Sequence, residues 1–335
     1  MPQTHLDNPS ANEANNLAPL SRTRLQPQSQ KASGKKQDSV NVDINGNTLT
    51  LTHLDKVYFP ESGISKGELI QFYTEMAPYI LPHLSQSPFV MVRYPGGIHG
   101  EFFYQKECPL QAPEWITRYT DPHSESSLTY VVCDKLSTLV YLINLGCIEL
   151  HSWAATIEHP EYPSWAVFDL DPDPPSGISE AFEVARMLGQ ILKELKMKFL
   201  VKTSGSKGIH ILLPLIPNHT YLEVQRGIEG VCRFLLKQRP DICTMERSIK
   251  RRQGKIYLDY LQNGRGRTMA GIYSVRPTPQ GQVSTPLLWE EVNSGVAPEE
   301  FTLRNFGKRL ETVGDLSEVM KEKNDFGRIL HYFLK

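Results

Sequence analysis

Long apolar runs are missing from this chain. A transmembrane helix needs about 18 or more consecutive apolar residues, and no such run occurs among the 335 residues. The first residues also lack the continuous apolar stretch of a secretory signal. We therefore expect a cytoplasmic protein without a membrane partner.

Cysteine is scarce as well. The five cysteines form no Cys-x-x-Cys pair and have no histidine at metal-binding spacing; they are Cys108, Cys133, Cys147, Cys232 and Cys243. This pattern argues against a structural zinc site and against a disulfide framework. It fits a reducing compartment such as the cytoplasm.

An excess of either charge is absent too, since 36 Lys and Arg residues face 37 Asp and Glu residues. A chain with this balance does not attract phosphate over its whole surface, so any phosphate-binding face must be a local basic patch. Apolar residues make up 40% and charged residues 22% of the chain, as in globular proteins. Most of the chain should therefore fold around a substantial core.

Aromatic and β-branched residues are nearly absent from residues 1–40, which are rich in Gln, Asn, Ser and Pro. Such a segment cannot bury enough surface to offset its chain entropy. We expect a disordered tail over residues 1–40 and a folded domain over residues 41–335.

Strands and helices are mixed in the folded part. Alternation and turn residues predict strands at 89–95, 164–171, 198–203, 209–215 and 255–261, and a hairpin over 42–54 that turns at Asn45-Gly46. Helical periodicity and capping boxes predict helices at 65–76, 136–150, 179–196, 220–237 and 315–323, with a last one near residue 335. The order is not a strict alternation, so the pattern predicts an α+β fold.

The segment "VFDLDPDPP" carries the strongest chemical signal. Side chains alternate along a strand, so Asp169 and Asp171 point the same way, about 6–7 Å apart. Two such acids repel each other unless a cation lies between them, and hard divalent cations bind carboxylate oxygens. Pro172 and Pro174 then end strand pairing, which places the acids at a strand end. A solvated acidic turn is the alternative interpretation.

A third acid lies in the apolar segment "KIYLDYL". A buried carboxylate there must be paired or bound to a metal, and a nearby Arg or Lys would satisfy Asp259 equally well. If Asp259 meets Asp169 and Asp171, the three acids form the arrangement that two-metal phosphoryl transfer requires.

The segment "KTSGSKGIHI" places a Gly- and Ser-rich turn between two predicted strands. The groups available to an anion are Ser204, Ser206, Lys207, Gly208 and His210. Exposed backbone N–H groups in such a turn form a nest suited to a triphosphate. The turn does not match the Walker pattern, and an ordinary hairpin loop remains the alternative.

Basic and aromatic residues surround these segments. Arg251 and Arg252 precede the strand of Asp259. Lys66 lies near the start of a capped helix, where free N–H groups and the helix dipole favour a phosphate. Phe102 and Phe103 form a pair that can stack on a base, although such pairs are also common in protein cores.

Taken together and in this order, these motifs resemble the archaeo-eukaryotic primase superfamily. More closely, the chain is similar to the polymerase domain of bacterial ligase D, the repair enzyme of non-homologous end joining. The matching stretches are "LTHLDKVYFPESGISKGELIQFY", "FFYQKE", "IELHSW", "FDLDPDP", "TSGSKGIHI", "LDYLQNGRGRT", "YSVR" and "STPLLWEEV". The resemblance spans about Leu49 to the C-terminus and implies a primase-like catalytic domain, with mixed or antiparallel sheets flanked by helices.

The resemblance also implies roles for individual residues. Asp169, Asp171 and Asp259 match catalytic ligands for two Mn²⁺ or Mg²⁺ ions. The nucleotide-binding residues that it implies are Ser204, Ser206, Lys207, Gly208, His210, Arg276, Phe102 and Phe103. The residues expected at DNA, including a 5′-phosphate, are Lys56, Lys66, Arg251 and Arg252. Ile272 stands where the family usually has a proline, which puts the geometry of that loop in question.

The implied activity is the addition of ribo- or deoxynucleotides to 3′ ends at DNA gaps or double-strand breaks. The implied partners are nucleoside triphosphates, DNA ends or gapped DNA, a separate ligase and an end-binding protein, with the chain acting as a stand-alone polymerase near the nucleoid.

Two other hypotheses stay open at this point. One is a haloacid dehalogenase-type phosphohydrolase with Asp169 as nucleophile, although the usual Gly-Thr after the acids is missing. The other is a non-catalytic module that binds DNA ends, for which three clustered acids would bring no advantage.

Overall fold

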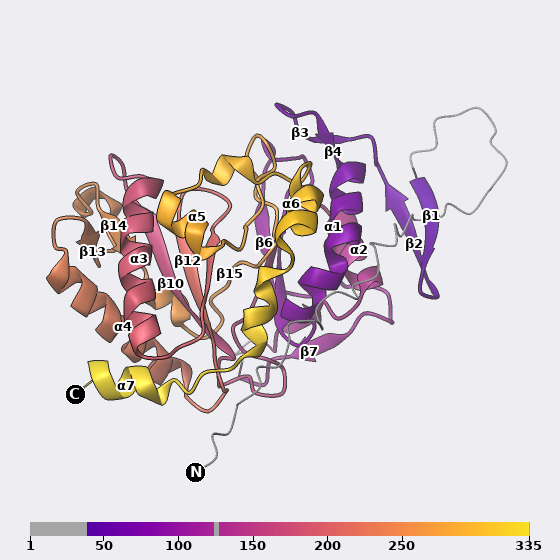
Figure 1. The fold of residues 1–335 in the computed structure, drawn as a ribbon. Helices are drawn as coiled ribbons and strands as arrows, with labels where there is room; N and C mark the ends of the chain where they lie inside the picture. Colours follow the sequence, from indigo (N-terminus) through magenta and orange to yellow (C-terminus); the bar gives the residue numbers. More distant parts are fainter. Residues whose placement is uncertain (1–38, 124–126, 335) are drawn as a thin grey trace, which may run out of the picture.

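A computed structural model describes residues 39–123 and 127–334. Two β-sheets form the centre of this part of the chain, and helices cover their outer sides (Figure 1). Helices and mostly antiparallel strands are mixed along the sequence, which confirms the predicted α+β class. The expected tail falls, up to residue 38, outside the described residues.

The first sheet comes mainly from the N-terminal half. It runs β15-β9-β5-β8-β7, with β6 also paired to β5, and all of its pairs are antiparallel. Its strands are β5 (Pro88–Arg93), β6 (Phe103–Gln105), β7 (Arg118–Thr120), β8 (Thr129–Val132), β9 (Cys147–Ser152) and β15 (Met269–Ala270). Helices α1 (Lys66–Ile80) and α2 (Leu136–Asn144) share one apolar core with this sheet.

The second sheet follows in the sequence and runs β11-β12-β10-β14-β13. Its strands are β10 (Trp165–Pro172), β11 (Leu200–Thr203), β12 (Ile209–Pro214), β13 (Cys243–Thr244) and β14 (Ile256–Leu258). All pairs are antiparallel except β13 with β14. Helices α3 (Ile178–Glu194) and α4 (Tyr221–Gln238) share a second core with it, and α7 (Gly327–Phe333) packs on α4.

Strand alternation decides which side chains of β10 reach the space between the sheets. Phe168 and Leu170 pack with α3 and α4 in the second core, whereas Val167 belongs to the first core. Since successive side chains point to opposite faces, Asp169 and Asp171 share the face of Val167. Both acids therefore lie on the side that is turned toward the first sheet.

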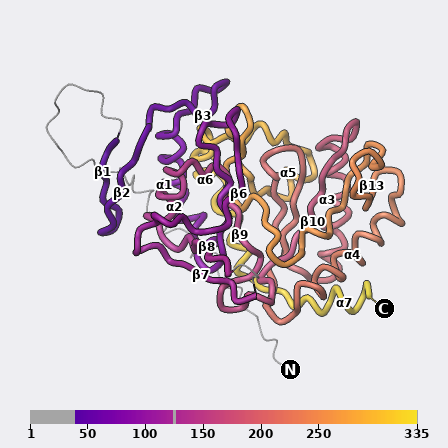
Figure 2. Tube along the Cα trace, turned by 180° about the vertical axis from the view of Figure 1, so that it is seen from behind, coloured from indigo at the N-terminus to yellow at the C-terminus, as the bar shows by residue number. Residues whose placement is uncertain are grey.

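The remaining elements connect and border the two sheets. They are the hairpins β1 (Ser39–Ile44) with β2 (Asn47–Thr52) and β3 (Val57–Phe59) with β4 (Ile64–Ser65), helices α5 (Trp289–Ser294) and α6 (Phe306–Val313), and 3-10 turns at Leu81–His83, Ile249–Arg251, Tyr260–Asn263, Pro298–Glu300 and Leu316–Lys321. Seen from behind, the two halves of the chain lie side by side (Figure 2). The C-terminal segment returns to the first half, because Phe306 of α6 packs edge to face on Phe72 of α1.

Most predicted elements are confirmed, and the local signals explain why. Asn45 and Gly46 have φ angles of 53° and 80° at the turn between β1 and β2, as a tight hairpin turn requires. Ser65 and Glu68 form both halves of the capping box that begins α1. Thr220 caps α4 in the same way.

Three predicted elements are wrong in part. The helix expected over 136–150 ends at Asn144, and residues from Cys147 form β9, because pairing with β5 and β15 overrides the helical pattern. The strand expected over 255–261 ends at Leu258, so Asp259 follows β14 and caps a 3-10 turn. The helix expected over 315–323 is a 3-10 turn at Leu316–Lys321.

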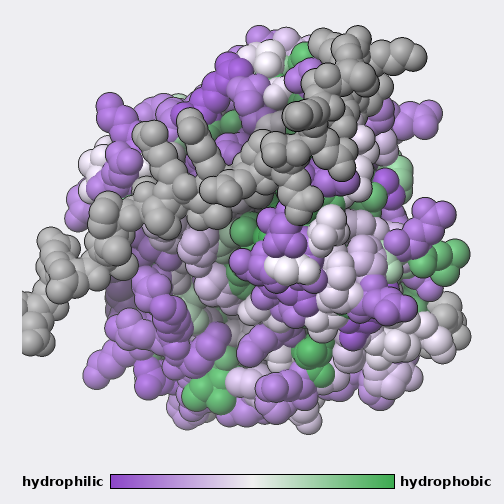
Figure 3. Space-filling model, turned by 90° about the vertical axis from the view of Figure 1, so that its right-hand side faces the viewer, coloured by the Kyte–Doolittle hydropathy of each residue, from purple (hydrophilic) through white to green (hydrophobic). Residues whose placement is uncertain are grey.

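One face of the molecule is mostly polar where its residues are coloured by hydropathy. On the face seen in Figure 3, hydrophilic residues dominate the coloured atoms, and hydrophobic residues appear in small separate groups. No helix within residues 39–123 and 127–334 is long and apolar enough to span a bilayer.

Candidate active site

Three neighbouring strands place a row of polar side chains on the inner face of the second sheet. In the register of the sheet, Lys202 of β11 lies opposite His210 of β12, which lies opposite Asp169 of β10. The Lys202 Nζ atom is 2.9 Å from His210 Nδ1. On the other side of the ring, His210 Nε2 is 3.4 Å from Asp169 Oδ1.

Asp259, which directly follows β14, meets Asp169 of β10 beside this row. The amide of Asp259 donates to the carbonyl of Asp169 at 3.0 Å, which ties the end of β14 to β10. Burial raises the pKa of Asp259, and the charge of Asp169 raises it further. Burial raises the pKa of Asp171 as well, where the added effect of Asp169 opposes that of Arg252. Asp169 is thus close enough to both other acids to make their ionisation costly.

Asp171 and Asp259 each have a further partner. Arg252 Nη1 lies 2.9 Å from Asp171 Oδ2, and Asp259 accepts hydrogen bonds from the Leu261 amide and the Tyr257 hydroxyl. In the part of the chain that the structure describes, no three His, Cys, Asp or Glu side chains form a ready-made metal cluster. The donor set nevertheless fits a hard divalent cation, because three carboxylates that repel one another are the oxygen ligands such ions bind.

The Ser-Gly-Ser-Lys-Gly turn joins β11 to β12 beside the row. The buried Ser204 Oγ accepts the amide N–H groups of Ser206 and Gly208 at 3.2 and 3.0 Å. These two N–H groups are therefore bonded inside the turn, and the prediction that the turn leaves them exposed is wrong. The side chain of Lys207 is exposed, and Gly205 has φ +74°, a conformation that L side chains rarely adopt.

Arg276 connects the two sheets. Its Nη1 donates to the Ser204 carbonyl at 2.6 Å, and its Nε lies 2.7 Å from Glu149 Oε2 on β9. Glu149 is buried and also accepts the hydroxyl of Tyr94 at 2.8 Å. One arginine thus holds the turn of the second sheet against a buried acid of the first.

The sequence analysis missed Glu149 and His151 as site residues. Both lie on β9, two positions apart, so they share one face of the strand. Neither ring nitrogen of the buried His151 has a hydrogen-bond partner among the described residues, although Nε2 lies 3.6 Å from Glu149 Oε2. Burial lowers the pKa of His151, and Glu149 opposes this shift. The signal was present, because polar residues in alternation within the apolar "CIELHSW" repeat the logic of the two aspartates on β10.

The two predicted phenylalanines do not form one platform. Phe102 is 55% exposed and stacks on Tyr94 with ring centroids 5.3 Å apart. Phe103 lies beneath the guanidinium of Arg93, at 5.2 Å. Tyr104, which was not predicted, packs edge to face on both Phe102 and His151. Alternation along the chain therefore divides the pair between two faces.

Lys56 and Lys66 come together at the start of α1. Lys66 is buried and its Nζ donates to the Thr52 carbonyl at 2.7 Å, while the exposed Lys56 reaches the Pro95 carbonyl at 2.6 Å. Burial, with the charge of Lys56, lowers the pKa of Lys66 to about 8.

The first N–H groups of α1 are not free, however. Those of Lys66 and Gly67 donate to the carbonyls of Lys56 and Leu54, and that of Glu68 donates to Ser65 Oγ. The prediction of free helix N–H groups at this position is therefore wrong.

The two predicted arginines differ in their surroundings. Arg252 is almost buried between Asp171 and the ring of Tyr257, which its guanidinium covers at 4.0 Å. Arg251 has a side chain that is 78% exposed and lies 3.9 Å from Glu246. Arg251 is thus available to an external phosphate, whereas Arg252 first has to leave Asp171.

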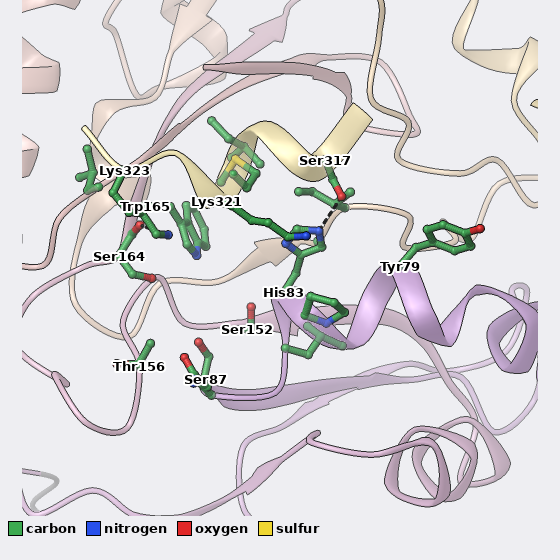
Figure 4. A pocket seen from close by; sticks show the side chains of 18 of the residues that line it. Tyr79, His83, Ser87, Ser152, Thr156, Ser164, Trp165, Ser317, Lys321 and Lys323 are labelled. Atoms are coloured by element: carbon green, nitrogen blue, oxygen red, sulfur yellow. Dashed lines mark hydrogen bonds between the residues drawn. The ribbon is translucent and has the colours of Figure 1, made fainter. Parts of the chain in front are cut away.

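A cavity of about 470 Å³ lies beside the start of β10 and the end of β12, away from the acids (Figure 4). Trp165, His83 and Lys323 line it, and His83 Nε2 is 2.9 Å from Ser317 Oγ. None of the three acids lines this cavity, but Lys202 does. The cavity therefore reaches the Lys202 end of the row of polar residues.

Two facing sheets with neighbouring carboxylates and a Ser-Lys-Gly turn are compatible with a nucleotidyltransferase of the primase-polymerase type. Residues 65–317 match the family described as LigD, primase-polymerase domain. The chain belongs to this family. The membership contradicts the phosphohydrolase hypothesis.

Named relatives agree with this assignment. The chain is 34% identical over 267 residues to the bifunctional non-homologous end joining protein LigD of Bacillus subtilis, covering 79% of this chain and 43% of that protein. It is 32% identical over 268 residues to the multifunctional LigD of Pseudomonas aeruginosa, covering 80% of this chain and 32% of that protein. The chain thus spans less than half the length of these relatives.

A solved structure shares the fold. The polymerase domain from Mycobacterium tuberculosis ligase D, in complex with DNA, superposes with a TM-score of 0.76 at 27% sequence identity. The match covers 82% of this chain and 99% of that domain. The fold seen here is therefore that of a LigD polymerase domain.

Proposed function

We propose that this protein adds nucleotides to the 3′ ends of DNA at gaps or double-strand breaks by two-metal nucleotidyl transfer. The observation that carries the proposal is that Asp259, which follows β14, lies beside Asp169 and Asp171 of β10, where the charge of Asp169 raises the pKa of both other acids. The DNA in the related M. tuberculosis structure supports a nucleic-acid substrate.

In the proposed reaction, the 3′-hydroxyl of a primer attacks the α-phosphate of a nucleoside triphosphate and pyrophosphate leaves. Asp169, Asp171 and Asp259 would hold two Mn²⁺ or Mg²⁺ ions, which when bound neutralise the developing charge and activate the attacking oxygen. The acids would fix the place of the reaction, so their positioning by β10 and by the turn after β14 would contribute directly to the rate.

The nucleotide would lie between the two sheets. The residues proposed to hold its triphosphate are Ser204, Ser206, Lys207, Gly208, His210 and Arg276. Arg276 already spans the two sheets, so it can orient the triphosphate toward the acids. Phe102, with Tyr94 and Tyr104 around it, offers an exposed ring for a base, while Phe103 would serve the template side.

The DNA would contact two separate basic groups. Lys56 and Lys66 lie together at the start of α1 and would bind the 5′-phosphate across a gap. The exposed Arg251, together with Arg252, would contact the backbone near the acids. Because the formal net charge is −1, these local groups rather than the whole surface would attract DNA.

The relatives carry names of end-joining proteins, and the chain spans only part of their length. We therefore propose that this domain works with a ligase and an end-binding protein, and we place it in the cytoplasm close to the nucleoid.

A primer-extension assay tests the function. Gapped DNA with and without a 5′-phosphate is offered with ribo- or deoxynucleotides and with Mn²⁺ or Mg²⁺, and blunt DNA is added to detect untemplated addition. Asp259→Ala should abolish extension and leave DNA binding nearly unchanged, because it removes a ligand but no phosphate contact. Asp241→Ala, which removes an exposed acid paired with Arg239, is the matched control and should remain active.

Two outcomes would contradict the proposal. Undiminished extension by Asp259→Ala would remove Asp259 from the catalytic residues. Salt-sensitive DNA binding by the wild-type chain, without incorporation under any of these conditions, would favour the end-binding module instead.

A further inference from the structure

Lys202 is the most deeply buried charged side chain beside the candidate site. Its exposed fraction is 0%, although lysine is almost never fully buried without a carboxylate partner. In the described part of the chain, no carboxylate lies within ion-pair distance of its Nζ atom. This burial therefore requires an explanation in terms of the other groups that Lys202 touches.

Burial lowers the pKa of Lys202 well below its usual value, but the hydrogen bonds of its side chain fit a donating ammonium group. Its Nζ atom contacts His210 Nδ1 at 2.9 Å, the Ala270 carbonyl at 3.1 Å and Ser284 Oγ at 2.5 Å. The Ser284 hydroxyl donates to the carbonyl of Thr203 at 2.9 Å, so its oxygen is free to accept. An ammonium group has three N–H donors, and here it finds three acceptors.

This assignment fixes the proton on His210. If Nδ1 accepts a hydrogen bond from Lys202, the single proton of the neutral ring is on Nε2. That nitrogen faces Asp169 Oδ1 at 3.4 Å, a carboxylate that can only accept when ionised.

We propose that Lys202 is a positioning residue, which holds His210 from behind and keeps its Nε2–H directed toward Asp169 and the triphosphate site. The part of this inference that concerns the triphosphate rests on the proposed function. A bound triphosphate beside His210 would bring negative charge close to this buried lysine.

The fold supports this role through the sheet register. Lys202, His210 and Asp169 lie directly opposite one another on β11, β12 and β10. Cross-strand neighbours on one face have side chains within contact distance. The row therefore needs no loop to assemble it, and the ring of His210 is supported on both sides.

The tautomer is the first measurement. His-selective ¹⁵N labelling with NMR distinguishes a protonated from an unprotonated ring nitrogen, and His210→Gln assigns the signal. In the wild-type protein without nucleotide we expect protonated Nε2 and bare Nδ1, and in Lys202→Met we expect a mixture of tautomers. Lys202→Gln keeps an N–H donor and should preserve the wild-type signal; if Lys202→Met preserves it too, the proposal is wrong.

This measurement is independent of polymerase activity, so it separates the two hypotheses. A protein with the expected tautomer that extends no primer would contradict the proposed function but leave the role of Lys202 toward His210 intact. For an active protein, Lys202→Met should raise KM for the nucleoside triphosphate roughly ten- to a hundredfold, the effect of one hydrogen bond to a charged group. The kcat value and DNA affinity should change much less.

The cavity described above allows a second test, because Lys202 is one of the residues that line it. Lys202→Ala should extend this cavity as far as His210. Propylammonium, which replaces the lost part of the side chain, can then enter and restore the hydrogen bond to Nδ1, lowering KM again. Lys202→Met fills the same space and should show no rescue.

Rescue of Lys202→Ala by propylammonium, but not by sodium chloride at equal ionic strength, would support the positioning role. Absence of rescue in a variant that melts like the wild type, or equal rescue of Lys202→Met, would overturn it.

Discussion

Asp169 determines the electrostatics of the candidate site, because it lies between the other two acids. Its charge raises the pKa of both Asp171 and Asp259 beyond the effect of burial. A cation between the acids would remove this repulsion. Arg252 already compensates part of the negative charge through its ion pair with Asp171. Local charge balance at these residues therefore favours the binding of further positive charge.

A residue-scale prediction concerns Lys66. Its pKa is lowered to about 8 by burial and by Lys56, so its charge is complete below that pH and is lost as the pH rises through it. We expect the preference for a 5′-phosphorylated gap to be clear at pH 7 and to decline above pH 8. Binding to gapped DNA with and without the 5′-phosphate, measured by fluorescence anisotropy across this range, checks it.

The variants sharpen this test. Lys66→Ala should show little preference at any pH, whereas Lys308→Ala, which removes an exposed lysine on α6, should behave as the wild type. An equal loss of affinity for both DNA ends in Lys66→Ala would contradict a specific phosphate contact.

At the scale of single elements, close packing of the turn on β10 keeps the site in register. A Cβ atom at Gly208 would lie 2.6 Å from the carbonyl oxygen of Leu170, between the two aspartates of β10. A backbone carbonyl cannot rotate away as a side chain can. The turn therefore needs glycine here because of the approach of β10.

We expect Gly208→Ala to separate β12 from β10 and to displace the acids. The cost should be about 1–3 kcal/mol of stability, as for other overpacked positions, with a larger loss in primer extension. Gly307→Ala is the matched control, since a Cβ at this position in α6 meets nothing within 4 Å and alanine favours helix. Thermal melts and extension rates measure both; wild-type values for Gly208→Ala would disprove the constraint.

Element prediction from the sequence succeeded where the signal was local and failed where it was not. The capping boxes of α1 and α4 involve residues three positions apart, and both were predicted correctly. The segment from Cys147 has a helical pattern, but β5 and β15 pair with it and make it a strand. Asp259 was expected inside a strand and instead caps the turn that follows β14.

At the scale of the whole molecule, the candidate site is shared between two sheets. The acids and the Ser-Lys-Gly turn belong to the second sheet, whereas Glu149 and His151 belong to the first. Arg276 connects them through the Ser204 carbonyl and Glu149. A nucleotide bound between the sheets would therefore contact both halves of the chain.

We expect hydrogen–deuterium exchange to show that a bound nucleotide contacts both halves of the chain. A nucleoside triphosphate with Mn²⁺ should slow exchange in the turn at 204–208 and also in residues 94–104 of the first half, because one ligand orders both. Adenosine, which lacks phosphates, should protect 204–208 much less. Protection confined to one half by the triphosphate would contradict a site between the sheets.

The sequence by itself determined the pair of acids on one strand face, the hairpin turn, the helix caps and the order of motifs that resembles the LigD polymerase domain. These features depend on residues close together in the chain. Only the tertiary structure decided that Asp259 meets Asp169, that Arg276 binds Glu149, and that Lys202 holds His210. The reason is physical: these contacts depend on how strands far apart in the sequence pair and face each other, and no local pattern encodes that register.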